Sequence, residues 1–186
     1  MSLKNLISNY AAFNEWANAQ IVMWLKTLDK EILYTKTTSS YPSIDYTLQH
    51  ILRGQKFWYL FITGQDTSNF NWSVYEGEVD RIMQELVDSS ALMKDTYSTF
   101  SEEELLEVLH LDVPWAKNSR SRYDYIVHII NHGSFHRGQI VTMARMLDFT
   151  DGIVNTEDNI LIFYCQWCKS KINGRKVLNP HYKLFL

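Results

Sequence analysis

Three of the six histidines in this 186-residue chain stand at four-residue intervals on one predicted helix: His128, His132 and His136. Residues four apart in a helix lie about 6 Å apart along its axis and on nearly the same face, so two neighbouring imidazoles can bind one metal ion. The first and last of the three are about 12 Å apart along the axis, so all three cannot bind one ion equally well. The spacing predicts a pair of metal ligands, with hydrogen-bonded or half-exposed histidines as the alternative.

Two familiar classes of metalloenzyme do not fit this cluster. His132 and His136 share the spacing of the zinc-protease motif H-E-x-x-H, but Gly133 stands where the catalytic glutamate belongs. A carboxylate-bridged di-metal bundle needs Glu-x-x-His on two helices, and the chain has that sequence once, from Glu107 to His110. Peptide hydrolysis and di-metal chemistry are therefore disfavoured.

A third ligand from another helix would strengthen the prediction of a metal site. His50 is the natural candidate, although a single histidine in an apolar helical sequence is more often a core residue. His110 lies in a segment of uncertain structure, and His181 lies in the C-terminal tail. Cys165 and Cys168 form a C-x-x-C pair without the context of a redox or zinc motif, and we interpret them as two reduced thiols.

The composition is that of a single helical domain with an aromatic core. Only 7 Gly and 3 Pro are present against 26 aromatic residues, which disfavours disorder and turn-rich β-sandwiches. The formal net charge is −3, without the dense basic face that nucleic acid requires, and the longest apolar runs are too short to span a membrane. The start of the chain has no signal-peptide core, so we expect a soluble cytoplasmic protein that binds neither nucleic acid nor membrane.

Hydrophobic periodicity predicts four long helices, over residues 4–28, 44–63, 76–99 and 121–147. Ser43 is the expected N-cap of the second helix, with Gly64 as its stop signal. We expect the crossover 101–121 to have mixed structure, opening on a cap at Ser101 followed by acidic residues. Ser121, with Asp124 three positions on, is the expected start of the fourth helix, and a short apolar segment over 159–167 is a candidate fifth element.

The last 18 residues differ in composition from the rest of the chain. They contain five basic and no acidic residues, whereas residues 1–168 contain 13 basic and 21 acidic residues. We therefore expect residues 1–168 to form the folded domain and residues 169–186 to be a basic tail, disordered or loosely attached.

Three segments of the sequence together resemble one known family. The run from Asn131 to Gln139 is similar to the signature N-H-x-x-x-H-R-G-Q of the DinB-like (YfiT-type) metalloenzymes. Residues 13–18, Phe-Asn-Glu-Trp-Ala-Asn, resemble the first-helix motif of that family, and residues 46–51, followed by Phe57 and Trp58, resemble its second-helix segment. The resemblance covers about residues 4–166 in matching order.

The resemblance implies a fold and a metal site. The fold is an all-α four-helix bundle in up-down-down-up order, usually a homodimer, with an irregular crossover between helices three and four. The site holds one divalent metal ion, zinc, nickel or iron, through His50, His132 and His136, and His128 has no ligand role. We interpret His128 as a core imidazole or one that supports the ligands.

The resemblance fixes the metal better than the reaction, and it assigns no catalytic residue. Three neutral imidazoles leave a coordination position open, as in catalytic sites. Relatives that use low-molecular-weight thiols suggest a metal-dependent thiol transferase or a hydrolase. The alternatives are a binding module, in which the metal holds a small ligand or stabilises the bundle without turnover, and a metal-free scaffold.

Residues near the proposed ligands are weaker candidates for a role in the site. Trp16, Trp58 and Tyr59 are candidates to form a pocket wall, with core packing as the alternative. We expect Arg137 to be a salt-bridge or interface residue that projects away from the site, and Gln139 to bond a neighbouring helix. Glycines inside predicted helices are costly, and we expect three near the ligands to let helices two and four approach closely: Gly54, Gly133 and Gly138.

Overall fold

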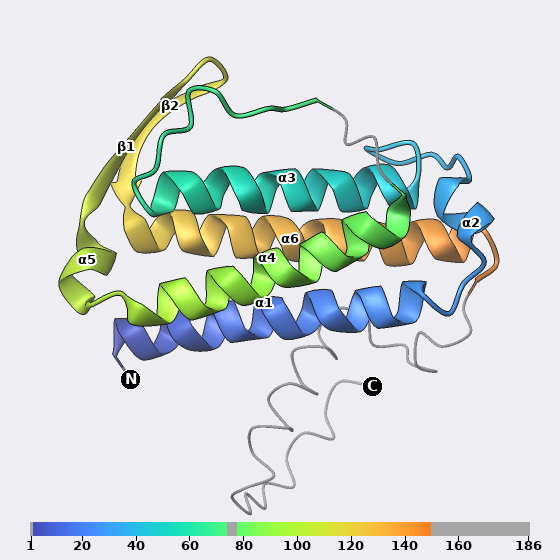
Figure 1. Cartoon of the computed structure of the whole chain (residues 1–186), viewed down its shortest axis with the longest axis horizontal. Helices are drawn as coiled ribbons and strands as arrows, with labels where there is room; N and C mark the ends of the chain where they lie inside the picture. Colours follow the sequence, from blue (N-terminus) through green and yellow to red (C-terminus); the bar gives the residue numbers. More distant parts are fainter. Residues whose placement is uncertain (1, 74–77, 150–186) are drawn as a thin grey trace, which may run out of the picture.

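The computed structural model describes residues 2–73 and 78–149, which are mostly helical with one two-stranded sheet (Figure 1). Within these residues, four long helices lie side by side: α1 (Leu3–Leu25), α3 (Ile44–Ile62), α4 (Val79–Thr99) and α6 (Arg122–Met146). In Figure 1, α1 and α6 run in one direction and α3 and α4 in the other. α1 packs on α4 and α6, and α3 packs on the same two helices.

The helix ends agree with the predicted boundaries to within a few residues. Gly64 follows α3 with a positive φ of 74°, which confirms it as the stop signal, because a residue with a side chain rarely adopts that conformation. Ser43 and Ser121 occupy the N-cap positions of α3 and α6, but their hydroxyls donate to Asp45 and Asp124 instead of accepting from backbone N–H groups.

The first helix ends three residues before its predicted boundary. α1 ends at Leu25, and an additional short helix, α2 (Lys30–Tyr34), follows beyond the predicted range 4–28. Asp29 begins α2 by accepting a hydrogen bond from the Glu31 N–H. Leu28 lies in the connection and still packs against the core, so the apolar stripe extends beyond the end of the helix.

The crossover contains a helix and a β-hairpin, so the fold is not purely α-helical. Ser101 and Glu104 form a complete capping box at the start of α5 (Glu102–Leu106). Strands β1 (Val108–Val113) and β2 (Ala116–Ser121) then pair in antiparallel register, and the two residues between them, Pro114 and Trp115, make the turn. The expectation of mixed structure in the crossover is confirmed. The described residues are mostly helical, so the predicted all-α class holds approximately, with this small two-stranded sheet as the exception.

One buried arginine fixes the start of α6 against the elements that precede it. Arg122, only 8% exposed, donates to the backbone carbonyl of Ile62 at the end of α3. It also donates to the Glu104 carbonyl at 2.9 Å and to the Glu107 carboxylate.

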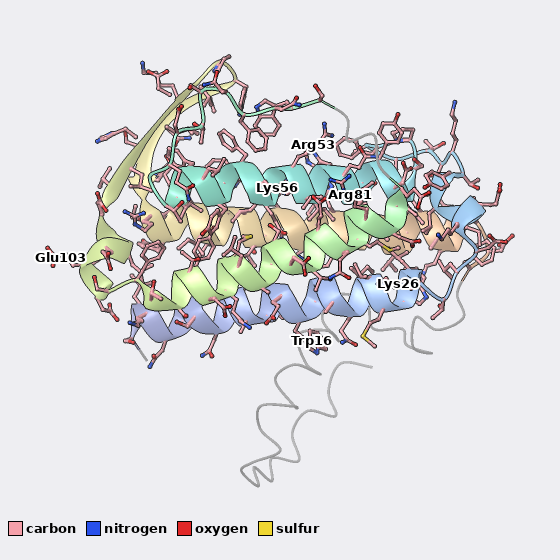
Figure 2. All side chains as sticks on the ribbon, viewed as in Figure 1. Trp16, Lys26, Arg53, Lys56, Arg81 and Glu103 are labelled. Carbon is pink, nitrogen blue, oxygen red and sulfur yellow. The ribbon has the colours of Figure 1, made fainter. Side chains whose placement is uncertain are left out.

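Ion pairs also link neighbouring helices at the surface. Glu85 of α4 pairs with Lys56 of α3, and it also pairs with Arg81 on its own helix (Figure 2). Such exposed pairs add little stability.

The apolar core consists of two clusters along the helices. One includes Ile21, Leu48, Leu86 and Ile140, and the other includes Ile7, Phe57, Met93 and Ile130. On each of the four long helices, a buried polar side chain lies in sequence between the two clusters: Asn14 and Asn18, Gln55, Ser90 and Arg137. The core is therefore interrupted by a polar layer, which lies close to the histidines.

Some predictions fall outside the described residues. These are the apolar segment 159–167, Cys165, Cys168 and the basic tail 169–186. Among the described helices, none combines the length and apolar character needed to cross a membrane.

Candidate metal centre

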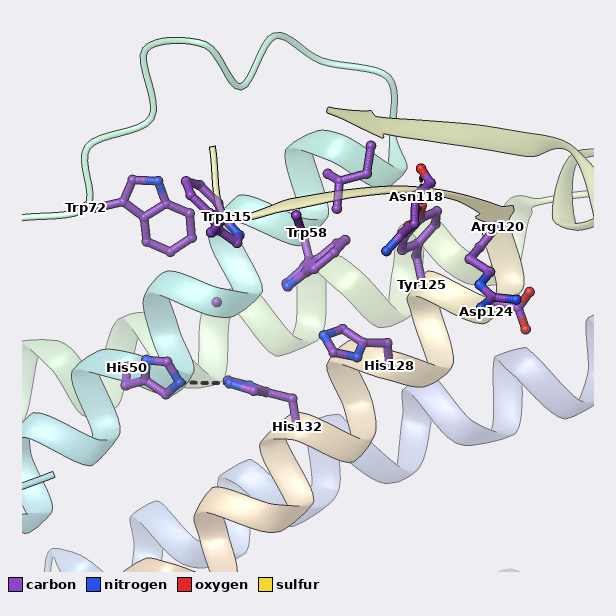
Figure 3. A pocket seen from close by; sticks show the side chains of 13 residues that line it. His50, Trp58, Trp72, Trp115, Asn118, Arg120, Asp124, Tyr125, His128 and His132 are labelled. Carbon is purple, nitrogen blue, oxygen red and sulfur yellow. Dashed lines mark hydrogen bonds between the residues drawn. The ribbon is translucent and has the colours of Figure 1, made fainter. Parts of the chain in front are cut away.

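The structure brings together the three histidines that the family resemblance named. His50 comes from α3, and His132 and His136 come from successive turns of α6. The Nε2 atom of His132 lies 2.8 Å from Nε2 of His50 and 3.1 Å from Nε2 of His136 (Figure 3 shows the first pair). Three imidazole nitrogens from two helices therefore converge on one point.

Hydrogen bonds to the other ring nitrogens determine which nitrogen is free to bind a metal. Oε1 of Gln139 accepts from Nδ1 of His136 at 2.6 Å, so Nδ1 carries the proton and Nε2 keeps its lone pair. The Tyr41 hydroxyl lies 2.7 Å from Nδ1 of His50 and can accept a hydrogen bond from it in the same way. Gln139 also donates to Ser40 at 2.9 Å, which holds its amide in place. Such outer contacts orient metal-binding histidines.

The environment keeps the three imidazoles neutral at neutral pH. Burial, followed by the neighbouring His136, lowers the pKa of His50 to about 4. Burial and the same neighbour lower the pKa of His132 to about 3. Burial also lowers the pKa of His136, although its bond to Gln139 opposes the shift. Neutral imidazole is the form that binds metals.

The donor set fits a divalent metal ion. Ligand nitrogens at about 2.0 to 2.1 Å from a tetrahedral ion lie about 3.3 Å from one another, a few tenths of an ångström more than the contacts of His132. Nε2 of His132 carries at most one proton, so it can donate a hydrogen bond to His50 or to His136 but not to both. At least one of the two short Nε2–Nε2 contacts therefore lacks a hydrogen bond. Nδ1 of His132 is buried and has no hydrogen-bond partner among the described residues. The cluster is therefore poorly satisfied by hydrogen bonds alone.

Gly54 allows α3 and α6 to approach each other beside the histidines. A Cβ atom at this position would lie 3.2 Å from Cε1 and 3.6 Å from Nδ1 of His132. This agrees with the expected role of Gly54. Gly133 does not serve the same contact, because a Cβ there would meet Nη1 of Arg137 at 3.1 Å and Oδ1 of Asn14 on α1 at 3.3 Å. The role expected for Gly138 stays a prediction.

Arg137 points into the protein, contrary to the expectation that it projects away. It is 2% exposed, and its Nη1 donates to Oδ1 of Asn14 at 3.0 Å and of Asn18 at 2.6 Å. Its Nη2 donates to Ser134 at 2.8 Å. Burial lowers the pKa of Arg137 to about 10, so it stays charged at neutral pH. The α1 segment and the α6 segment that resemble the family are therefore joined directly by the hydrogen bonds between Arg137 and the two asparagines.

A cavity of about 710 Å³ opens beside His50 and His132, between α3, α6 and the hairpin (Figure 3). His128 lines it and is exposed, with its ring 5.0 Å from that of Trp58, so it is not a core residue. The ring centroids of His128 and His132 are 6.3 Å apart, and His128 lies outside the three-histidine cluster. Trp58 forms part of the cavity wall as expected, but Trp16 and Tyr59 do not.

Tyr41 is a residue of the site that no pattern in the sequence predicted. It lies in the connection before α3, and its ring stacks on that of His50 with centroids 4.4 Å apart. No periodic pattern marks a residue in such a loop. The adjacent Pro42, as a helix boundary, was the only available signal that this segment folds back near the start of α3.

Comparison with known proteins agrees with the resemblance found in the sequence. The sequence profile described as "DinB family" matches residues 1–160. A curated relative, "Protein DinB" from Bacillus subtilis (strain 168), is 28% identical over 143 residues, which cover 74% of this chain and 83% of the relative. The range matched by the profile contains all three clustered histidines and the asparagines that bind Arg137.

Proposed function

The chain belongs to the DinB family, and from this premise we propose that it binds one divalent metal ion, zinc, nickel or iron, through His50, His132 and His136. The observation that carries the proposal is the convergence of three Nε2 atoms on one point, with two contacts of 2.8 and 3.1 Å at His132. A cation bound by all three Nε2 atoms would replace the two short nitrogen–nitrogen contacts, which cannot both be hydrogen bonds. Imidazole ligands suit each of the three metals, so the ligand set does not choose among them.

We propose further that the bound ion makes the site catalytic, as a metal-dependent thiol transferase or hydrolase. An ion held by three neutral imidazoles would supply a Lewis acid with an open position, lowering the pKa of a water or thiol there so that its deprotonated form, with the proton released to solvent, would be available as a nucleophile near neutral pH. The chain contributes the orientation of the imidazoles through Tyr41 and Gln139. The adjacent cavity gives a small molecule access to the His50 and His132 side of the cluster.

The metal site is tested by elemental analysis of protein purified without an affinity tag. We expect one zinc, nickel or iron ion per chain in the wild type and none in His132→Ala. His110→Ala is the matched control, because His110 is exposed on the hairpin and lies outside the cluster. A wild type without stoichiometric metal, after reconstitution with each of the three ions, would reject the proposal.

The reaction is tested separately. Metal-loaded and chelator-treated protein are assayed for conjugation of low-molecular-weight thiols to electrophiles and for ester or amide hydrolysis. We expect turnover that requires the metal and is lost in His132→Ala. Stoichiometric metal without turnover would favour the second candidate, a binding module in which the metal holds a small ligand or stabilises the fold.

We propose that the four long helices form the up-down-down-up bundle of the family, and that two copies associate as a homodimer. The directions of the helices in Figure 1, with α1 and α6 running one way and α3 and α4 the other, support the first part. Exposed apolar side chains on α6, Phe135 and Met146 at 61% and 57% exposure, support the second. Light scattering during size-exclusion chromatography tests the dimer. A cytoplasmic location stays a prediction from the sequence.

A further inference from the structure

The cavity beside the histidines is built mainly from aromatic rings. Its volume of about 710 Å³ lies within the range of small-molecule sites, roughly 300 to 1,000 Å³. α3 and α6 form its floor, and the hairpin together with the loop after α3 covers it (Figure 3). His50 and His132 lie at one end, and Asn118, Arg120 and Asp124 lie at the other.

Two tryptophans from separate segments form the cover at the end near the histidines. Trp72 comes from the loop after α3, and Trp115 comes from the turn of the hairpin. Their rings are nearly perpendicular, with centroids 5.0 Å apart, and both pack against Phe57 of α3, with ring centroids 4.9 and 5.7 Å away. Yet Trp72 remains 40% exposed and Trp115 remains 57% exposed. Large apolar side chains gathered and exposed at the mouth of a cavity indicate a ligand site.

The floor of the cavity presents a second aromatic surface. Trp58 of α3 stacks on Tyr125 of α6 with centroids 5.4 Å apart and an interplanar angle of 26°. His128 contacts the Trp58 ring edge to face. These rings brace one another from two helices, so the floor is held in position without a ligand. A flat ring entering the cavity would meet aromatic groups above and below, with which it would form the offset-stacked or edge-to-face pairs that aromatic rings prefer.

The charges that line the cavity favour an uncharged occupant. Among the described residues that line it, Arg120 and Asp124 carry formal charge, with opposite signs and on the same wall (Figure 3). Away from the proposed metal site neither sign is in excess, so an ionic group at that end of the ligand would find no net complement among the lining side chains. Asn118, beside this pair, offers hydrogen bonds to a neutral polar group.

We propose that this cavity binds a flat, uncharged aromatic molecule and that the substrates of the protein are aromatic small molecules. The ring lies between Trp58 and the cover formed by Trp72 and Trp115, and one end of the molecule faces His50 and His132. The reaction at that end rests on the proposed metal site, whereas the binding of the ring does not.

The test uses 2-naphthol as the probe and decahydro-2-naphthol, its saturated counterpart, as the control ligand. Binding to the full chain is followed by calorimetry and by NMR of the indole N–H signals. We expect Trp72→Ala and Trp115→Ala each to weaken 2-naphthol binding about tenfold, because each removes a ring from the cover. Both side chains are partly exposed, and circular dichroism checks that the variants fold. Trp16→Ala is the matched control, since Trp16 lies on α1, away from the cavity (Figure 2).

Three outcomes would overturn the proposal: no binding of 2-naphthol by the wild type, equal affinity for both ligands, or equal weakening by Trp16→Ala. Metal content is measured on the same samples, with and without chelator. Protein that takes up no metal but binds 2-naphthol as expected would reject the metal site and keep the aromatic site. Protein with stoichiometric metal and an affinity unaffected by the cover variants would reject the aromatic site alone.

Discussion

The guanidinium of Arg137 on α6 donates a hydrogen bond of 2.6 Å to the side-chain oxygen of Asn18 on α1. Asn18 in turn donates to Ser90 on α4 at 2.7 Å, and Ser90 contacts the side-chain amide of Gln55 on α3. A continuous polar chain thus joins all four long helices at the level of the neighbouring His136. This chain couples the placement of α6, which carries two of the three clustered histidines, to the packing of the other helices.

Asn18→Ala is expected to lower the free energy of unfolding by about 3 kcal/mol, because it removes an acceptor from a buried positive charge. Both Asn18 and Arg137 are almost completely buried, so water cannot replace the lost oxygen. Urea unfolding measures the change. Asn5→Ala removes an exposed asparagine from the same helix and should change stability by less than about 0.5 kcal/mol. Similar losses in the two variants would contradict a special role for the buried amide.

Gly54→Ala is expected to separate stability from metal binding. Alanine favours the helix by up to about 1 kcal/mol, but its Cβ presses on the ring of His132 at 3.2 Å. We expect unchanged or increased resistance to urea together with metal affinity reduced about tenfold, measured by competition with a chromogenic chelator.

Gly133→Ala provides the contrast on the neighbouring helix. Its Cβ would press on Arg137 and Asn14 instead, so we expect a loss of stability. If Gly54→Ala bound metal as tightly as the wild type, the close approach of α3 and α6 would not limit the site.

Tyr41→Phe is expected to weaken metal binding about tenfold, because supporting hydrogen bonds to metal-binding histidines typically contribute 10- to 100-fold in affinity. The variant keeps the ring that stacks on His50 and removes only the hydroxyl beside Nδ1. Tyr46→Phe is the matched control, since Tyr46 lies on α3 and is 38% exposed. Isothermal titration with zinc distinguishes them, and equal affinities would show that the Tyr41 hydroxyl does not support the site.

Metal-free protein is expected to lose stability as the pH falls below about 6.5. The pKa values of His50 and His132 are lowered to about 4 and about 3 in the folded protein, so the unfolded chain takes up protons that the folded chain does not. Above the pKa of histidine in the unfolded chain, these residues are neutral in both states and the free energy of unfolding keeps its full value. It declines as the pH falls from there toward the lowered pKa values of the folded protein.

Urea unfolding of chelator-treated protein at neutral pH and at about pH 5 measures this dependence. His132→Ala should show a smaller difference between the two conditions than the wild type, and His110→Ala should match the wild type. Identical pH dependence in the wild type and His132→Ala would contradict the lowered pKa of His132.

Local patterns in the sequence were sufficient for most of the secondary structure. The four long helices follow from their apolar stripes, the end of α3 follows from Gly64, and the start of α5 follows from Ser101 and Glu104. These features depend on residues a few positions apart, which is why a sequence reveals them. The hairpin was harder to predict, because its strands are short and much of β2 is exposed and polar, without the alternation of a half-buried strand.

The sequence by itself determined which residues share a face: the four-residue spacing of His132 and His136 places them on one side of α6 whatever α6 packs against. It also carried the family motifs. Only the tertiary structure decided what each face meets. It brought His50 of α3 to His132 through the contact at Gly54, placed Tyr41 beside His50 and Gln139 beside His136, and turned Arg137 toward α1. Such contacts join residues up to 123 positions apart, and they depend on how whole helices pack, which no local spacing specifies.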